Sequence, residues 1–285
     1  MEMFNTLTTY LELLNWGKDY LSGQEVDEDV ARWLMLERLE MSHTDFIIQR
    51  NKTIPESDKE QYYQDIKKAS NHYPPQYIVG REWFYGYAFQ VNEATLIPRP
   101  ETEEWFDRYI KALPDKKLTV VDVGTGSGVI GITHKLLRPQ DTVILTDISK
   151  AALDVAKSNA QHLGTDVLLL EGDTLEPLIS RNISVDLLIS NPPYISESEW
   201  NEMDHSVRTF EPKNALFATS NGLAIYERLL KQSSIVLSHN SSILLEIGYK
   251  QSEAVKKIIR QYYPQSDVEL WTDVNGLDRV VKINV

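Results

Sequence analysis

The stretch DVGTGSG, residues 122–128, decides the fold class of this 285-residue chain. It overlaps the end of LTVVDV (118–123), an apolar and β-branched run typical of a buried strand, and a helix is expected from 128 to 137. Glycine has no Cβ and tolerates positive φ, so the three glycines let the backbone turn sharply and approach a ligand closely. The spacing G-x-G-x-G differs from the dinucleotide fingerprint. The turn therefore indicates a strand, a ligand-binding turn and a helix, with a plain tight turn as the structural alternative.

Strand-like and helix-like segments alternate through the rest of the chain. Continuous apolar strands separated by helices are typical of a mostly parallel sheet with both faces covered. The pattern predicts an α/β fold whose strands are 118–123, 142–147, 166–173, 185–190, 242–248, 267–271 and 278–284. The expected helices of this part are 128–137, 149–163, 222–237 and 250–262.

Residues 1–75 have a different character, because their apolar residues recur at helical spacing and valine is rare. This spacing predicts four or five short helices. Two pairs of residues, Ser22 with Glu25 and Ser42 with Asp45, have the spacing of a helix start. In such a start the serine side chain accepts from the backbone N–H of the acid, and the acid side chain accepts from the backbone N–H of the serine.

Pro74 and Pro75 break the helical pattern. The aromatic and β-branched run EWFYGYAFQVN (82–92), with Gly86 near its centre, predicts a β-hairpin. We therefore expect three parts: a helical substrate-recognition domain (1–75), a linker with a β-hairpin (76–95) and a catalytic α/β domain (96–285).

Composition excludes several classes of function. The net charge of −13 leaves no broad basic field for phosphate backbones, so direct nucleic-acid binding is not expected. The absence of cysteine rules out disulfides and Cys-ligated zinc and fits the cytoplasm, and the six histidines never fall at metal-ligand spacing. No apolar run approaches the roughly 18 residues of a membrane span, and the N-terminus carries acids where a signal peptide carries basic residues. We expect a cytoplasmic protein without a metal or a membrane.

Carboxylates follow two further expected strands. Asp147 ends the strand at 142–147, about 20 residues beyond the glycine turn, where a ribose diol would donate two hydrogen bonds. Asp173 ends the next strand, where it could accept a hydrogen bond from an adenine amine. Each acid alone could be a solvated strand end. Together with the glycine turn they predict an adenosine-containing ligand, and NAD and S-adenosylmethionine (SAM) are both possible.

The string NPPY, residues 191–194, ends the fourth expected strand at the same edge of the sheet. Pro192 and Pro193 fix φ and cannot pair with a neighbouring strand, so the carbonyls stay available. An NH2 group could donate one hydrogen to the Asn191 side-chain oxygen and the other to the Pro192 carbonyl. Tyr194 would add a flat wall against a planar group. The string therefore favours a planar nitrogen as methyl acceptor over a turn that merely ends a strand, and it does not choose between a base and an amide.

The order of DVGTGSG, TD, GD and NPPY resembles the class I SAM-dependent methyltransferases. PPQYIVG (74–80), FYGYAFQV, LIPRPETE (96–103), NPPYI and VRTFEP (207–212) followed by NALF are similar to the PrmC/HemK family. Members of that family are protein-(glutamine) methyltransferases of peptide chain release factors. The resemblance covers the chain from about residue 74 onward.

The resemblance implies a Rossmann-like, mostly parallel sheet with an antiparallel C-terminal strand, SAM as cofactor and S-adenosylhomocysteine as product. It implies that a release factor is the protein partner, and that NPPY binds the glutamine amide of a Gly-Gly-Gln loop. We also expect the enzyme to be a monomer. The SAM-binding residues expected on this basis are Gly124, Thr125, Gly126, Ser127, Gly128, Asp147, Asp173, Thr174 and Asn191. The expected catalytic residues are Asn191, Pro192 and Tyr194, and those for substrate are Asn191, Pro192, Pro193, Tyr194 and Arg99, the last in a loop that closes over both ligands.

One departure from the family is visible at Thr174, where family members often carry an aromatic residue that stacks on adenine. Leu175 or Pro177 could replace it. Other functions stay open on the sequence: methylation of a flipped DNA or RNA base, methylation of a ribosomal-protein glutamine, or a noncatalytic adenosine-nucleotide or NAD-binding module.

Overall fold

Two compact units make up the chain in the computed structural model, which describes residue 4 and residues 6–285. The larger unit comprises Glu82–Met203 and Glu211–Val285. The smaller one runs up to Arg81 and also includes Asp204–Phe210, a segment from the second half of the chain. The sequence predicted parts that end at residues 75 and 95, and it did not predict that Asp204–Phe210 would group with the helical residues.

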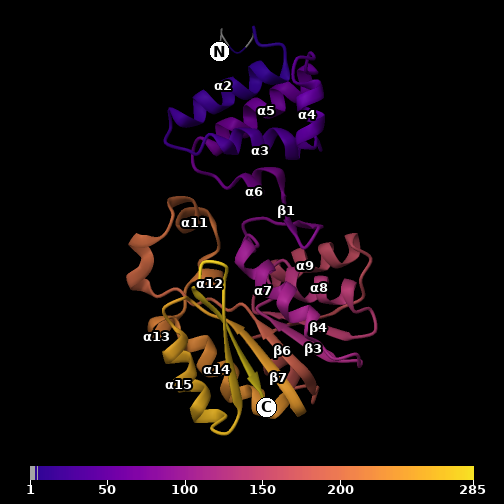
Figure 1. The fold of residues 1–285 in the computed structure, drawn as a ribbon, viewed down its shortest axis with the longest axis vertical. Coiled ribbons are helices and arrows are strands. Elements are labelled where there is room, and N and C mark those ends of the chain that lie inside the picture. The colour runs from indigo at the N-terminus through magenta and orange to yellow at the C-terminus, as the bar shows by residue number, and fades with distance from the viewer. Residues whose placement is uncertain (1–3, 5) are drawn as a thin grey trace. The chain divides into compact units, whose positions relative to one another are not determined.

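A seven-stranded sheet forms the centre of the larger unit (Figure 1). In spatial order its strands are β5 (Leu168–Glu171), β4 (Thr142–Asp147), β3 (Thr119–Val123), β6 (Val185–Ser190), β7 (Leu237–Glu246), β9 (Asp278–Asn284) and β8 (Asp267–Thr272). The first five are parallel, and β9 runs antiparallel to both β7 and β8. The predicted mostly parallel sheet with an antiparallel C-terminal strand is confirmed. Since the chain moves to one side of β3 through β4 and to the other through β6, a ligand crevice is expected at the carboxyl ends of these strands.

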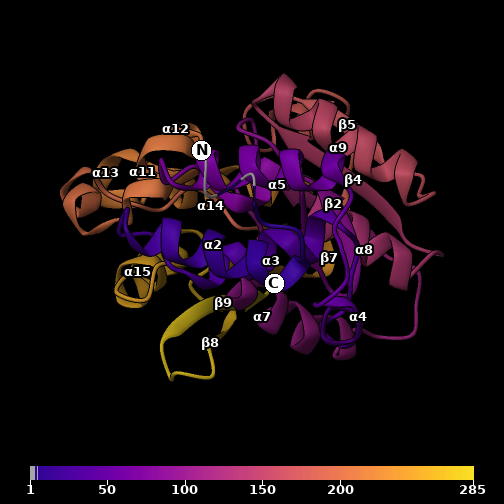
Figure 2. The same ribbon diagram turned by 90° about the horizontal axis from the view of Figure 1, so that it is seen from above.

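Helices cover both faces of this sheet (Figures 1 and 2). One core packs against α7 (Pro100–Lys111), α8 (Val129–Leu137) and α9 (Lys150–His162), and the other against α10 (Glu176–Ile179), α14 (Ala224–Val236) and α15 (Ser252–Tyr262). Val120 points into the first core and Val121 into the second, because successive strand residues face opposite sides. The short elements η1 (Glu197–Glu202), α12 (Lys213–Leu216) and α13 (Thr219–Gly222) follow β6. Burial on both faces explains why the strands read as continuous apolar runs.

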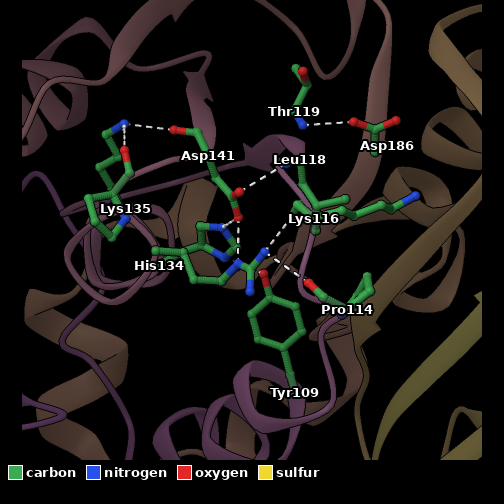
Figure 3. Close-up of polar contacts among 11 residues, drawn as sticks. Tyr109, Pro114, Lys116, Leu118, Thr119, His134, Lys135, Asp141 and Asp186 are labelled. Atoms are coloured by element: carbon green, nitrogen blue, oxygen red, sulfur yellow. Dashed lines mark hydrogen bonds and ion pairs between the residues drawn. The ribbon is translucent and has the colours of Figure 1, made fainter.

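A buried polar network ties α7 and α8 to the amino ends of β3 and β4 (Figure 3). Asp141 accepts hydrogen bonds from the Leu118 N–H at 2.9 Å, from His134 Nε2 at 2.8 Å and from Arg138 Nε at 2.6 Å. Burial lowers the pKa of His134, so its Nδ1 accepts from the Tyr109 hydroxyl while Nε2 donates. The network fixes α7, whose first turn lies at the opposite edge of the sheet.

The smaller unit is helical and contains α2 (Tyr10–Ser22), α3 (Asp29–Arg38), α4 (His43–Gln49), α5 (Glu56–Ala69), α6 (Pro75–Val79) and α11 (His205–Phe210). The helix start predicted at Ser42 and Asp45 is confirmed as a reciprocal cap. The one predicted at Ser22 is wrong, because Ser22 is the last residue of α2 and α3 begins at Asp29. Pro75 does not end the helical pattern either, since it is the first residue of α6, where a missing N–H has no cost.

The predicted β-hairpin is present as β1 (Arg81–Phe84) and β2 (Tyr87–Gln90). Its turn residues, Tyr85 and Gly86, have φ of 52° and 79°, the left-handed pair that suits a two-residue hairpin turn. Across residue 4 and residues 6–285, no helix has both the length and the apolar character needed to cross a membrane.

Candidate cofactor and substrate site

A cavity of about 290 Å³ opens at the carboxyl ends of β3, β4, β5 and β6. Most of the residues predicted from the sequence line it: Arg99, Gly124, Thr125, Gly126, Ser127, Asp147, Asp173, Thr174, Asn191, Pro192 and Pro193. Gly128 and Tyr194 lie outside the lining. The sheet topology thus brings together residues that lie up to 94 positions apart in the sequence.

The glycine turn borders the cavity with its backbone. Gly124 and Gly126 have φ of 68° and 58°, and a Cβ on either would meet no heavy atom within 4 Å, so the space beside both is open. Gly128 has a different task, since a Cβ there would lie 2.6 Å from Ile132 and 3.2 Å from Ala156. Gly128 therefore allows α8 to pack closely, and the first two glycines leave room for a ligand.

The Asp122 carboxylate is hydrogen-bonded to the glycine turn and to the helix that follows it. Asp122 was not among the predicted site residues. Its Oδ2 accepts hydrogen bonds from the Thr125 hydroxyl at 2.6 Å and from the Gly131 N–H at 3.0 Å. Its Oδ1 is buried without a hydrogen-bond partner in the described part of the chain. Burial raises the pKa of Asp122 to about 6. Its position two residues before the first glycine was the available signal, because an acid there can accept hydrogen bonds from the turn that follows it.

Asp147 sits at the end of β4, as predicted, and its carboxylate is partly exposed to the cavity. Oδ2 accepts from the Gly126 N–H at 3.0 Å and Oδ1 from the Ser149 N–H at 2.8 Å. Burial raises the pKa of Asp147 above its ordinary value. Since each carboxylate oxygen has a second lone pair, both can still accept from the two hydroxyls of a ribose.

The end of β5 departs from the prediction at the adenine position. The Asp173 carboxylate pairs with Arg228, and the Thr174 hydroxyl donates to Gln232 Oε1 at 2.6 Å. Leu175 is fully buried, and neither it nor Pro177 lines the cavity, so neither replaces the missing aromatic wall. The apolar lining near this point comes instead from Ile148, which is 62% exposed, and from Ile225. The only signal in the sequence was an isoleucine directly after Asp147, and its exposure follows from the structure alone.

The two acceptors expected from NPPY are both available. Within residue 4 and residues 6–285, no group donates a hydrogen bond to Asn191 Oδ1 or to the Pro192 carbonyl. Asn191 Nδ2 instead donates to the Thr102 hydroxyl at 3.4 Å. Asn191 therefore presents its oxygen as a free acceptor beside the cavity.

Tyr194 is packed differently from the wall that the sequence predicted. A Cβ at Gly248 would lie 3.3 Å from its ring, and its carbonyl accepts from Gln251 Nε2 at 2.8 Å. Burial raises the pKa of its phenol well above the ordinary value. The residue anchors the NPPY segment to the loop after β7, and Gln251, which sequence reasoning missed, completes that anchor.

Arg99 lines the cavity but is not a free cation. Its guanidinium pairs with Glu211 Oε1 at 2.5 Å, and Glu211 Oε2 accepts from the Ile97 N–H at 3.1 Å. Glu211 is 4% exposed. This pairing links the LIPRP segment to the acid of VRTFEP, because Glu211 holds Ile97 and Arg99 in place at the cavity.

These features suit SAM. The backbone cradle of the turn leaves space for a ligand, Asp147 can accept from a ribose diol, and apolar side chains can hold a base. Asn191 and Pro192 offer acceptors to a second, NH2-bearing molecule. The arrangement can hold an adenosine-containing methyl donor beside a planar amine or amide.

Comparisons with known proteins agree with this geometry. Residues 12–80 match the family model of the PrmC N-terminal domain and residues 108–245 that of the methyltransferase small domain. A release factor glutamine methyltransferase of Enterococcus faecalis is 46% identical to the chain, covering 95% of it and 97% of that relative. One from Staphylococcus aureus is 39% identical, with 96% and 99% covered. The solved structure of a methyltransferase from Pyrococcus furiosus shares the fold at 14% identity, with a TM-score of 0.52 over 70% of this chain and 89% of that one.

Proposed function

We propose, because the chain belongs to the family of release factor glutamine methyltransferases, that it methylates the glutamine side-chain nitrogen in the Gly-Gly-Gln motif of peptide chain release factors. The methyl donor is SAM, and the product is S-adenosylhomocysteine. The single structural observation that carries an NH2-bearing acceptor is the pair of free oxygens, Asn191 Oδ1 and the Pro192 carbonyl. A primary amide has two N–H donors, and this pair can accept both. Family membership selects the glutamine amide over a base.

The residues of the chain act by positioning the methyl donor and the substrate amide, and none of them serves as a general acid or base. The sulfonium of SAM supplies an electrophilic methyl group when it is bound, with Gly124, Gly126 and Asp147 as the residues that would hold it. Asn191 and Pro192 grip both amide hydrogens and direct the nitrogen's π electrons toward the donor. Both acceptors are amide oxygens, which are weak bases, so the nitrogen would lose its proton, ultimately to water, only after its bond to the methyl carbon forms and the bond from that carbon to sulfur breaks. Orientation and exclusion of water then account for the rate, which is a contribution of several kcal/mol in well-positioned sites.

Methylation of a purified release factor tests the proposal. Incubation with SAM should add one methyl group to the glutamine of Gly-Gly-Gln, as read by peptide mass spectrometry. Asn191→Ala should lower turnover by about a hundredfold, because one of two acceptors that orient the nitrogen is lost. SAM affinity measured by calorimetry is the control and should change little. A methyl group on another residue, or full turnover by the variant, would refute the assignment.

The role of the helical unit belongs to the same proposal. A single glutamine offers little surface for selectivity, so recognition of the rest of the release factor needs additional surface, and the helical unit can supply it. A monomeric state, the lack of direct nucleic-acid binding and a cytoplasmic location stay predictions of the sequence.

A further inference from the structure

The orientation of the Asn191 amide poses a problem that asparagine cannot solve alone. Its oxygen and its NH2 group have nearly the same size and shape, and rotation about the last side-chain bond exchanges them. With the oxygen toward the cavity, Asn191 accepts from a substrate amide. With the NH2 group there, two sets of N–H donors face each other and the substrate is repelled. A group behind Asn191 must choose between the two.

Thr102 has the contacts to make this choice. Thr102 lies in the first turn of α7 and is 3% exposed, and its hydroxyl donates to Glu246 Oε2 at 2.7 Å. Since a hydroxyl has one hydrogen, Thr102 Oγ1 can only accept from Asn191, whose Nδ2 lies 3.4 Å away. That distance is at the long end for a hydrogen bond, but the alternative orientation would place two lone pairs against each other.

Glu246 fixes the direction of the Thr102 hydroxyl in turn. It lies at the end of β7 and is 3% exposed, and its Oε2 also accepts from the Trp105 indole N–H at 2.8 Å. An indole N–H can only donate and an ionised carboxylate can only accept, so with Glu246 ionised both hydrogen bonds at Oε2 are donated to it. With Glu246 ionised, the direction of every hydrogen bond from Trp105 to Asn191 is therefore determined.

We propose that Thr102 and Glu246 are positioning residues that turn the Asn191 oxygen toward the glutamine amide. The proposal rests on the proposed function for the identity of the acceptor, and it deepens that function by naming what keeps the acceptor site selective. A purely structural role, in which the two residues only join α7 to β7, is the competing explanation.

Kinetics separate the two explanations. Thr102→Val keeps the shape and removes the hydroxyl, and it should lower kcat about tenfold because Asn191 is then free to turn. KM for SAM should stay within about twofold. Thr102→Ser keeps the hydroxyl and should restore most of kcat. Equal activity of all three proteins, or failure of the serine variant to recover, would overturn the proposal.

A double-mutant cycle sharpens the test. Asn191→Asp has two equivalent oxygens, so no orientation remains to be chosen. In that background Thr102→Val should cost no further kcat, whereas a structural role predicts the same loss in both backgrounds.

A readout without substrate distinguishes failure of this proposal from failure of the proposed function. The Asn191 side-chain NH2 signals in a nitrogen-15 NMR spectrum can be assigned by their absence in Asn191→Asp. In the wild-type protein they should exchange slowly with water, and in Thr102→Val at least tenfold faster, with recovery in Thr102→Ser. Unchanged exchange would overturn the positioning role even if release factor is methylated, and the expected change would support it even if another molecule proves to be the substrate.

Discussion

Adding one methyl group at Gly222 should displace the NPPY segment and break its hydrogen bond with Gln251. Gly222 has φ of 81°, and a Cβ there would lie 2.0 Å from the Tyr194 carbonyl oxygen and 2.6 Å from Gln251 Nε2. A backbone oxygen cannot rotate away, so the NPPY segment would have to move by about 1 Å merely to reach the 3.0 Å below which Cβ contacts essentially never occur. A displacement of that size near reacting atoms can cost about a hundredfold in rate. Gly222→Ala should therefore lower kcat for release factor methylation about a hundredfold.

The stability of the same variant should fall as well. The left-handed backbone costs about 1–2 kcal/mol for a residue with a Cβ. Loss of the 2.8 Å hydrogen bond from Gln251 to Tyr194 adds about 0.5–1.5 kcal/mol. Denaturant unfolding measures the sum.

Gly276→Ala is the matched control. Gly276 has φ of 76°, but a Cβ there would meet no atom within 4 Å. It should lose the backbone contribution of about 1–2 kcal/mol and keep full kcat. If Gly222→Ala also turned over release factor at the wild-type rate, the idea that Gly222 and Gln251 set the position of NPPY would be refuted.

Two further predictions concern the carboxylates of the cofactor side. Asp147→Ala should weaken SAM binding in calorimetry by about 10- to 100-fold, because hydrogen bonds from a ribose to a charged acceptor are lost; unchanged affinity would remove Asp147 from the site. Asp122 should make stability depend on pH. The pKa of Asp122 is about 6 in the folded protein and 3.8 in its ordinary state. Its contribution to the free energy of unfolding is therefore complete below pH 3.8 and is lost as the pH rises through 6. The wild-type protein should therefore lose on the order of 3 kcal/mol relative to Asp122→Asn between pH 4 and pH 7 in urea unfolding, and parallel pH curves would contradict this.

The sequence predicted those parts of the fold that depend on local pattern. β4 and β6 have the expected bounds, and β3 differs by one residue, because continuous apolar runs ended by glycine, acid or proline mark a buried parallel strand on both sides. The cavity residues at 124–127, 147 and 191–193 followed from the rule that ligands bind at the carboxyl ends of such strands.

The remainder depends on contacts between distant residues. Thr102 and Glu246 are 144 positions apart, and nothing in either neighbourhood shows that α7 and β7 place them together. The same holds for Ile97 and Glu211, which are 114 positions apart.

Tyr194 was expected at the cavity and does not line it, because no sequence periodicity sets the direction of the chain after a strand ends. Its ring packs beside Gly248 instead. Ser22 failed as a helix start for a related reason: the capping spacing is short enough to occur by chance inside a helix end.

The grouping of Asp204–Phe210 with the helical residues has a consequence for protein engineering. Tyr73 and Phe210 pack edge to face with ring centres 5.0 Å apart, and His72 and His205 lie 5.1 Å apart in the same unit. The chain therefore enters this unit twice, and a single cut after Arg81 would strip Phe210 of its neighbour. Exchange of the helical part between relatives therefore has to carry two separate pieces of the gene, and substitutions in the helical part are expected to be correlated with substitutions in Asp204–Phe210.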